Sequence, residues 1–171
     1  MVGILIAGCA TASQSSPTSP LMPTPTQADR STSPPETAQP RWGATPVATS
    51  IKGVVYQVEV VRAGEPGYYK GLGERDRLPA GQGMLFLHTE EVPAPFWMKG
   101  MRFPLDILWI DSQGRIVHLE RNIPAQPGVP DNQLRLYRPS APARAVLEIN
   151  AGEADARNFD VGEQVLFIYE Q

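Results

Sequence analysis

Residues 96–111 (FWMKGMRFPLDILWID) carry the densest group of side chains that could bind an organic ligand. Trp97 and Trp109 supply indole rings, which stack on apolar ligand faces and keep an N–H group for orientation. Lys99 and Asp106 add one charge of each sign. A groove lined by these residues would suit a carbohydrate or a cell-wall fragment. Aromatic residues also dominate protein cores, so packing in the core stays open for both tryptophans.

The relation of Lys99 to Asp106 depends on local structure. Two apolar runs flank Arg102, Phe103 and Pro104, and this pattern predicts a β-hairpin with its turn at the proline. A loop of residues 102–104 would place Lys99 on the face away from Asp106, whereas a loop of residues 102–105 would place both charges on one face. A third role for Asp106, capping backbone N–H groups of the turn, also stays open.

Two further groups of residues are candidates for polar sites. Arg135 and Tyr137 lie in residues 122–142, a connection with five prolines and no periodicity, and such long connections are often functional. They are therefore added to the candidate ligand-binding residues. Arg75, Arg144 and Glu148 could form a buried structural network at strand ends or an anion-binding corner.

Three classes of function are compatible with these residues. The first is a non-enzymatic domain that binds a ligand or partner, with exposed indoles and ordinary carboxylates. The second is a hydrolase or transferase in which Asp106 or Glu148 acts as a general base beside Lys99 or Arg144. It predicts an open pocket and a carboxyl group whose pKa is raised by burial. The third is a structural accessory domain of an envelope assembly, which predicts a broad apolar patch without a pocket. We expect the first.

The composition argues against several partners. The chain has 15 basic and 18 acidic residues, a formal net charge of −3 and no run of Lys or Arg, which disfavours nucleic acid. His88 and His118 are far apart, with no cysteine near either one, so neither a metal site nor another cofactor is expected. Cys9 has no second cysteine to pair with.

The start of the chain predicts a membrane attachment. Residues 6–9 (IAGC) follow an apolar run and resemble the lipobox of bacterial lipoproteins, in which the cysteine receives a diacylglycerol before cleavage. The resemblance implies that Cys9 is lipidated and that the protein is extracytoplasmic, anchored to a bacterial membrane in the periplasm or at the cell surface. No Lys or Arg precedes Cys9, unlike in a complete signal peptide, so residues 1–9 are interpreted as a truncated signal and the true start codon is expected upstream.

Residues 10–50 are predicted to be a disordered tether. They are rich in Ser, Thr and Pro, with eight prolines between Pro17 and Pro46, and have too few apolar side chains to offset the entropy of ordering. At ~3.1 Å per residue in the polyproline conformation, this segment could reach about 100 Å. Trp42 is an exception within it and is a candidate to pack on the folded domain.

Residues 51–171 are predicted to form a single β-rich domain. Alternating apolar residues and turn signals predict several strands, and a short helix is expected within residues 151–159. The result is a compact, mainly antiparallel barrel or sandwich with one or two short helices. The expected strands cover residues 54–62, 84–88, 115–120, 143–150 and 164–169.

Several blocks of this domain occur together in a recognisable order. They are Gly71-Leu72, residues 83–86 (GMLF), 96–99 (FWMK), 104–111 (PLDILWID), 142–148 (PARAVLE) and Ala151-Gly152. In this combination the chain resembles the bacterial and archaeal family called domain of unknown function 192, over roughly residues 55–168. The family usually has Gly-Leu-Met where Gly73 stands here. The resemblance implies a compact, mostly β domain, often exported or lipid-anchored, without established activity or catalytic residues.

Overall fold

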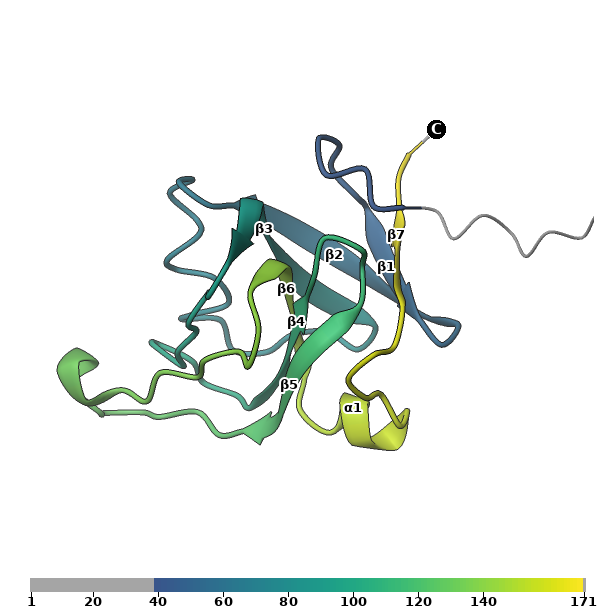
Figure 1. Ribbon diagram of the computed structural model, residues 1–171. Coiled ribbons are helices and arrows are strands. Elements are labelled where there is room, and N and C mark those ends of the chain that lie inside the picture. The colour runs from purple at the N-terminus through teal and green to yellow at the C-terminus, as the bar shows by residue number, and fades with distance from the viewer. Residues whose placement is uncertain (1–38, 171) are drawn as a thin grey trace, which may run out of the picture. The chain divides into compact units, whose positions relative to one another are not determined.

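The computed structural model describes residues 39–170, so Cys9 and residues 10–38 of the predicted tether lie outside the described residues. Seven strands form one sheet in the order β5-β4-β6-β3-β2-β1-β7, which curls into a half-barrel (Figure 1). The strands are β1 (Ala48–Ile51), β2 (Val54–Arg62), β3 (Gln82–Val92), β4 (Leu105–Ile110), β5 (Ile116–Ile123), β6 (Ala143–Asn150) and β7 (Val165–Ile168). One short α-helix, α1 (Glu153–Ala156), and one 3-10 turn, η1 (Asp131–Gln133), complete the described elements. The predicted fold class is confirmed.

All neighbouring strands pair antiparallel except β2 and β3, which are parallel. A parallel pair requires a crossover, and residues 63–81 make it from the end of β2 to the start of β3. The two edge strands approach each other at one end, where Arg115 and Gln164 form an isolated bridge and Ile116 N–H donates to the Glu163 carbonyl (2.9 Å). The sheet therefore closes partway toward a barrel.

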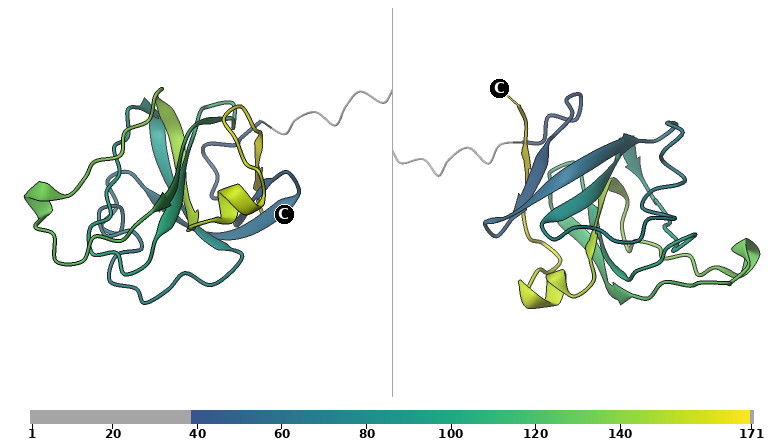
Figure 2. Two further views of the ribbon diagram at one scale, coloured as in Figure 1. Left: turned by 90° about the horizontal axis from the view of Figure 1, so that it is seen from below. Right: turned by 180° about the vertical axis from the view of Figure 1, so that it is seen from behind.

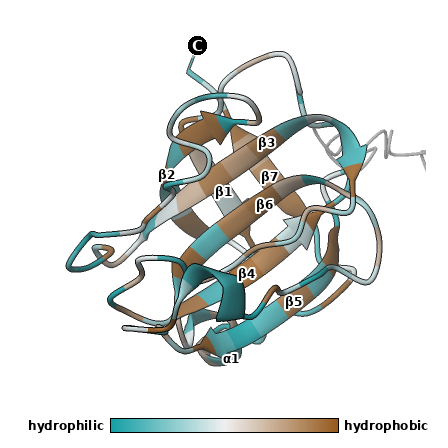
Figure 3. Ribbon diagram, turned by 90° about the vertical axis from the view of Figure 1, so that its left-hand side faces the viewer, coloured by the Kyte–Doolittle hydropathy of each residue, from teal (hydrophilic) through white to brown (hydrophobic). Residues whose placement is uncertain are grey.

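The central strands are buried on both faces. Every residue of β4 is buried, with Leu108 and Ile110 in the core inside the half-barrel and Ile107 and Trp109 in a second core on the outer face. Strand β5 at the edge is more hydrophilic than β4 and β6 (Figure 3). The long connections around residues 63–81, 93–104 and 124–142 lie on the side of the domain away from β1 and β7 (Figures 1 and 2).

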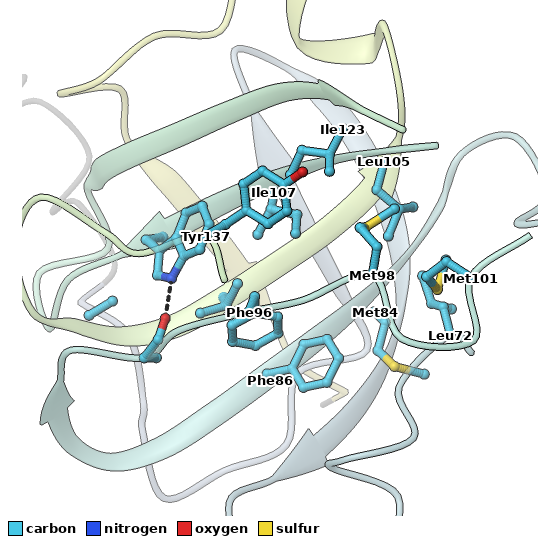
Figure 4. Close-up of a cluster of buried hydrophobic side chains, with 14 of the residues drawn as sticks. Leu72, Met84, Phe86, Phe96, Met98, Met101, Leu105, Ile107, Ile123 and Tyr137 are labelled. Carbon is cyan, nitrogen blue, oxygen red and sulfur yellow. Dashed lines mark hydrogen bonds between the residues drawn. The ribbon is translucent and has the colours of Figure 1, made fainter. Parts of the chain in front are cut away.

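The predicted hairpin over residues 96–111 is wrong. Residues 97–101 form no strand, and β4 pairs with β5 and β6 instead. Phe96 forms an isolated bridge to Tyr137, and Met98 and Met101 point into the outer-face core (Figure 4). The apolar side chains of the first run therefore cover the sheet rather than extend it, and an apolar pattern alone does not distinguish these two roles.

The folded domain begins before residue 51. Strand β1 pairs with both β2 and β7, although its first residues fall within the segment interpreted as tether. Trp42 packs edge-to-face on Phe167, with ring centroids 5.2 Å apart, and its Nε1 donates to the Ser112 carbonyl (2.9 Å). Within residues 39–170, no helix has the length and hydrophobicity needed to cross a bilayer.

Candidate functional site

A pocket of about 220 Å³ lies on the outer face of the sheet, beneath the connections that cover it. One wall comes from the crossover between β2 and β3, another from the segment before β4, and the floor from β3 and β6. Five of the thirteen lining residues are aromatic. The lining residues are Tyr68, Tyr69, Lys70, Gly71, Leu72, Phe86, Pro95, Phe96, Trp97, Lys99, Met101, Leu136 and Glu148.

Two glycines allow the walls of this pocket to approach closely. Gly71 has φ +52°, and a Cβ atom there would lie 3.2 Å from Cζ of Phe86. A Cβ atom on Gly73 would lie 2.9 Å from the carbonyl oxygens of both Lys70 and Lys99. The neighbouring Glu74 N–H donates to the Gly100 carbonyl (2.8 Å), which ties the two walls together.

Glu148 supplies a buried carboxyl group to the pocket. It lies on β6 between Met84 of β3 and Ile107 of β4, and only 5 % of its surface is exposed. Its Oε2 atom has no hydrogen-bond partner among the described residues. Burial disfavours the charged form and raises the pKa of Glu148 to about 8. The carboxyl group is therefore mostly protonated at neutral pH.

Tyr68 and His88 form a hydrogen-bonded pair beside this wall, with Tyr68 Oη 2.6 Å from His88 Nε2. Burial lowers the pKa of His88, so its imidazole is neutral at pH 7. Burial also raises the pKa of Tyr68, and the nearby Glu148 adds to this effect. Both side chains therefore remain uncharged around neutral pH.

The two lysines of the pocket are each engaged in an ion pair. Lys99 Nζ is 2.6 Å from Asp131 Oδ2, and Lys70 Nζ is 2.7 Å from Glu74 Oε2. Lys99 Nζ also lies 5.5 Å from the centroid of the half-exposed Trp97 ring. Because their charges are paired, these lysines add little net charge to the pocket.

The structure places Trp97 and Lys99 in the pocket but separates them from Trp109. Trp109 is fully buried, and its Nε1 donates to the Ala94 carbonyl (2.8 Å). Its ring packs edge-to-face on Phe96, with centroids 6.1 Å apart. Of the two tryptophans in residues 96–111, Trp109 therefore belongs to the core.

Asp106 has a structural role. It is fully buried and accepts hydrogen bonds from the backbone N–H groups of Asn122 (2.7 Å) and Ala154 (2.8 Å). Ala154 lies in α1, so the carboxylate joins β4 to β5 and to that helix. Lys99 is paired with Asp131 instead, and neither register of the predicted hairpin applies.

Arg135 and Tyr137 pack on each other, with the guanidinium 4.6 Å from the ring centroid. Tyr137 is buried and exchanges backbone hydrogen bonds with Phe96 (2.8 and 2.9 Å). Leu136, between them in sequence, lines the pocket and is 40 % exposed. The connection before β6 thus contributes to the site through Leu136.

The structure does not bring Arg75, Arg144 and Glu148 together. Arg75 makes a bidentate ion pair with Glu59 (2.5 and 2.8 Å). Arg144 Nε donates to the His88 carbonyl (3.0 Å), and only Glu148 lies in the pocket. Residues 39–170 contain no group of three or more His, Cys, Asp or Glu side chains arranged to hold a metal ion.

Sequence reasoning missed the crossover residues that form one wall of the pocket. Tyr68 and Tyr69 lie in a glycine-rich stretch without periodicity. Phe86 and Phe96 also line the pocket, although their sequence pattern is that of ordinary core residues. The one available signal was the adjacent tyrosine pair, of which Tyr69 is 75 % exposed.

Comparisons with known proteins give the family and the fold. A sequence model of the DUF192 family, described as "Uncharacterized ACR", matches residues 47–167. A protein of unknown function from Novosphingobium aromaticivorans has a similar crystal structure, with a TM-score of 0.62 and 30 % identity over 75 % of this chain and 89 % of that one. A putative transcription regulator from Sinorhizobium meliloti gives a TM-score of 0.58 and 28 % identity over 66 % of this chain and 82 % of that one. No curated protein matches.

The family match agrees with the sequence blocks that suggested it. Those blocks contribute Gly71 and Leu72 of the crossover, Phe86 of β3, Trp97 and Lys99 of the segment before β4, and Glu148 of β6 to the same pocket. A match that covers residues 47–167 includes every strand of the half-barrel except the end of β7. This chain therefore belongs to the DUF192 family of uncharacterised proteins.

Proposed function

We propose that this domain binds a small organic molecule in the aromatic pocket and that it does so without chemical conversion. One observation carries the proposal: Glu148, whose buried Oε2 has no hydrogen-bond partner in residues 39–170, is among the residues that line a concave site together with several aromatic rings. Concave apolar sites with a few convergent polar groups are the usual form of small-molecule sites. An unmet hydrogen bond inside such a site is costly until a ligand supplies its partner.

A second candidate function is general acid–base catalysis by Glu148. A pocket carboxyl group with a pKa raised to about 8 is the feature that the sequence analysis associated with an enzyme. The specific pairs considered there do not form, because Lys99 binds Asp131 and Arg144 binds the His88 carbonyl. Asp106 is held by two backbone N–H groups. Binding is therefore the better supported function.

We also propose that lipid at Cys9 anchors this binding domain outside the cytoplasm. The lipobox-like residues 6–9 and the proline-rich segment that follows support this part of the proposal. In this arrangement the anchor would hold the domain at the envelope, and the pocket would sample ligands there.

The binding proposal is tested by filling the mouth of the pocket. Leu136→Trp adds an indole at the pocket, whereas Leu166→Trp makes the same change on β7, outside the pocket lining, at a leucine of similar exposure (40 % and 42 %). Saturation-transfer NMR of the full chain with small amines, carboxylates, polyols and aromatic fragments should show binding to the wild type and to Leu166→Trp, and loss in Leu136→Trp. Absence of fragment binding to the wild type, or equal binding to both variants, would overturn the proposal.

A further inference from the structure

We infer that the ligand of this pocket is a small organic cation, an alkylammonium or quaternary ammonium compound, whose charged group lies between the aromatic rings and Glu148. This inference rests on the proposed binding function and adds the chemical class of the ligand. It is carried by three features of the pocket: its rings, its single acidic group and the pairing of its lysines.

The rings of the pocket lie at steep angles to one another, 84° between Phe86 and Phe96 and 86° between Phe86 and Tyr68. Phe86 packs edge-to-face on Phe96, with centroids 4.8 Å apart (Figure 4). It also packs edge-to-face on Tyr68, with centroids 5.6 Å apart. Tyr69 and Trp97 complete the aromatic lining. An aromatic face attracts a cation within about 6 Å of its centroid, and several rings around one site form the aromatic cages that bind quaternary ammonium groups.

Glu148 is the only acidic residue among the residues that line this pocket. Its carboxyl group, whose Oε2 has no partner among the described residues, can accept a hydrogen bond from an ammonium group or form an ion pair with a quaternary one. As a cation binds, the carboxylic acid gives its proton to solvent water and becomes a carboxylate. One positive charge enters and one proton leaves, so the net charge of the pocket and its contents does not change.

The two lysines do not exclude a cation. Each lies within 2.7 Å of a carboxylate, Lys70 with Glu74 and Lys99 with Asp131, so these four side chains carry no net charge together. The volume of about 220 Å³ limits the ligand to a size below that of drug-like molecules, which occupy sites of roughly 300–1,000 Å³. A small free amine fits this size.

The charge requirement is tested with cations and their uncharged counterparts. Isothermal titration of the full chain at pH 8 compares choline with 3,3-dimethyl-1-butanol, and n-butylammonium with 1-butanol; each pair is similar in size and differs in charge. We expect at least one cation to bind about tenfold more tightly than its counterpart. Equal or weaker binding of both cations, or preferential binding of butyrate, would overturn the inference. If uncharged fragments still bind in that case, the proposed binding function stands and only the preference for a cation is wrong.

The pH dependence gives a second test. Affinity for the cation should rise about tenfold per pH unit from pH 6.5 toward 8 and then level off, as Glu148 ionises without help from the ligand. Among the other groups facing this site, burial lowers the pKa of His88 and raises the pKa of Tyr68, so neither changes its charge in that range. Lys70 and Lys99 are held in ion pairs with Glu74 and Asp131. A flat profile would contradict the role of Glu148.

Two variants separate the contributions to cation binding. Glu148→Gln keeps the shape of the side chain but cannot ionise, so it should lose the preference for the cation and its pH dependence while it still binds the uncharged counterpart. Asp131→Asn leaves Lys99 unpaired at the pocket and should weaken cation binding about threefold without changing the pH dependence. Unchanged cation affinity in Glu148→Gln would refute the inference, and the Asp131→Asn result tests the site should Glu148→Gln not fold.

Discussion

Glu148 and Asp106 show how two buried carboxyl groups of one sheet acquire different roles. Asp106 accepts two backbone N–H groups, and hydrogen bonds to the charged form compensate the loss of water. Glu148 lies on the neighbouring strand β6, and its Oε2 has no such partner within the described part of the chain. Asp106 thus joins elements of the fold, whereas Glu148 lines the pocket with one oxygen unpartnered among the described residues.

The free energy of unfolding should report on Glu148 directly. In the unfolded chain its carboxyl group ionises near pH 4.5, whereas in the folded protein its pKa is about 8. The folded state therefore holds a proton that the unfolded state has lost between these pH values, and stability contributed by this residue falls as pH rises through that window. The contribution of Glu148 to the free energy of unfolding is therefore about 4 kcal/mol smaller at pH 8 than at pH 4.5.

Glu148→Gln removes this titration. Urea unfolding of the full chain should find the variant close to the wild type near pH 4.5 and more stable by a few kcal/mol at pH 8, roughly 2–4 kcal/mol. Glu90→Gln, at an exposed position of β3, serves as the control and should track the wild type within about 0.5 kcal/mol at both pH values. A Glu148→Gln protein that is less stable than the wild type at pH 8 would show that the folded protein stabilises the carboxylate.

At the scale of the elements, the strands could be predicted and the pocket could not. The predicted bounds 54–62 and 143–150 match β2 and β6, and residues 54–62 also show the alternation of a strand with one face more buried than the other. The run over residues 96–101 is equally apolar but lies as a covering segment over the outer face of the sheet. Whether such a run becomes a strand or covers a sheet depends on the segments that it contacts, and these lie far away in sequence.

Some of the site residues could likewise be predicted from the sequence, and others could not. Trp97 and Lys99 could be identified from their types, since an indole and a cation in one apolar segment suggest a binding surface. Trp109 has the same side chain as Trp97 but lies in β4, whose two faces are both buried. Glu148 was assigned to a network with two arginines because the sequence does not show that those arginines bind elsewhere. The residue types indicate which chemistry a side chain could perform, whereas the tertiary structure determines whether it is buried and which side chain it pairs with.

The contact between the crossover and the segment before β4 shapes the pocket, and Gly73 makes it possible. Gly73→Ala places a Cβ atom 2.9 Å from two backbone carbonyl oxygens, those of Lys70 and Lys99, so the two walls must move apart. We expect a loss of about 1–3 kcal/mol in the free energy of unfolding, together with weaker binding in the pocket. Urea unfolding and titration with the same ligand measure both effects.

Gly43→Ala is the matched control for this substitution. A Cβ atom there meets nothing within 4 Å, and the residue does not have a positive φ. It should change the free energy of unfolding by no more than about 0.5 kcal/mol and leave binding unchanged. Equal effects of the two substitutions would contradict the role assigned to the close contact at Gly73.

At the scale of the whole molecule, the pocket lies away from the point where the folded domain begins. Trp42 and β1 pack beside β7, and Arg41 N–H donates to the Tyr169 hydroxyl (2.8 Å), so residue 39 and the C-terminus share one side of the domain. The connections that cover the outer face of the sheet lie on the opposite side (Figures 1 and 2). The first described residues of the domain therefore contribute nothing to the lining of the pocket.

The proposed attachment at Cys9 predicts a covalent modification that can be measured. Because a thiol is the acceptor of the lipid, Cys9→Ser should abolish incorporation of labelled fatty acid into the protein expressed from its natural gene. The wild type should carry the label and sediment with membranes, since each buried CH₂ of its acyl chains contributes ~0.8 kcal/mol. Glu148→Gln, which alters the pocket alone, should be labelled like the wild type. A wild-type protein whose Cys9 is unmodified by mass spectrometry, and which stays in the soluble fraction, would overturn the envelope location and leave the binding proposal to be judged on the pocket alone.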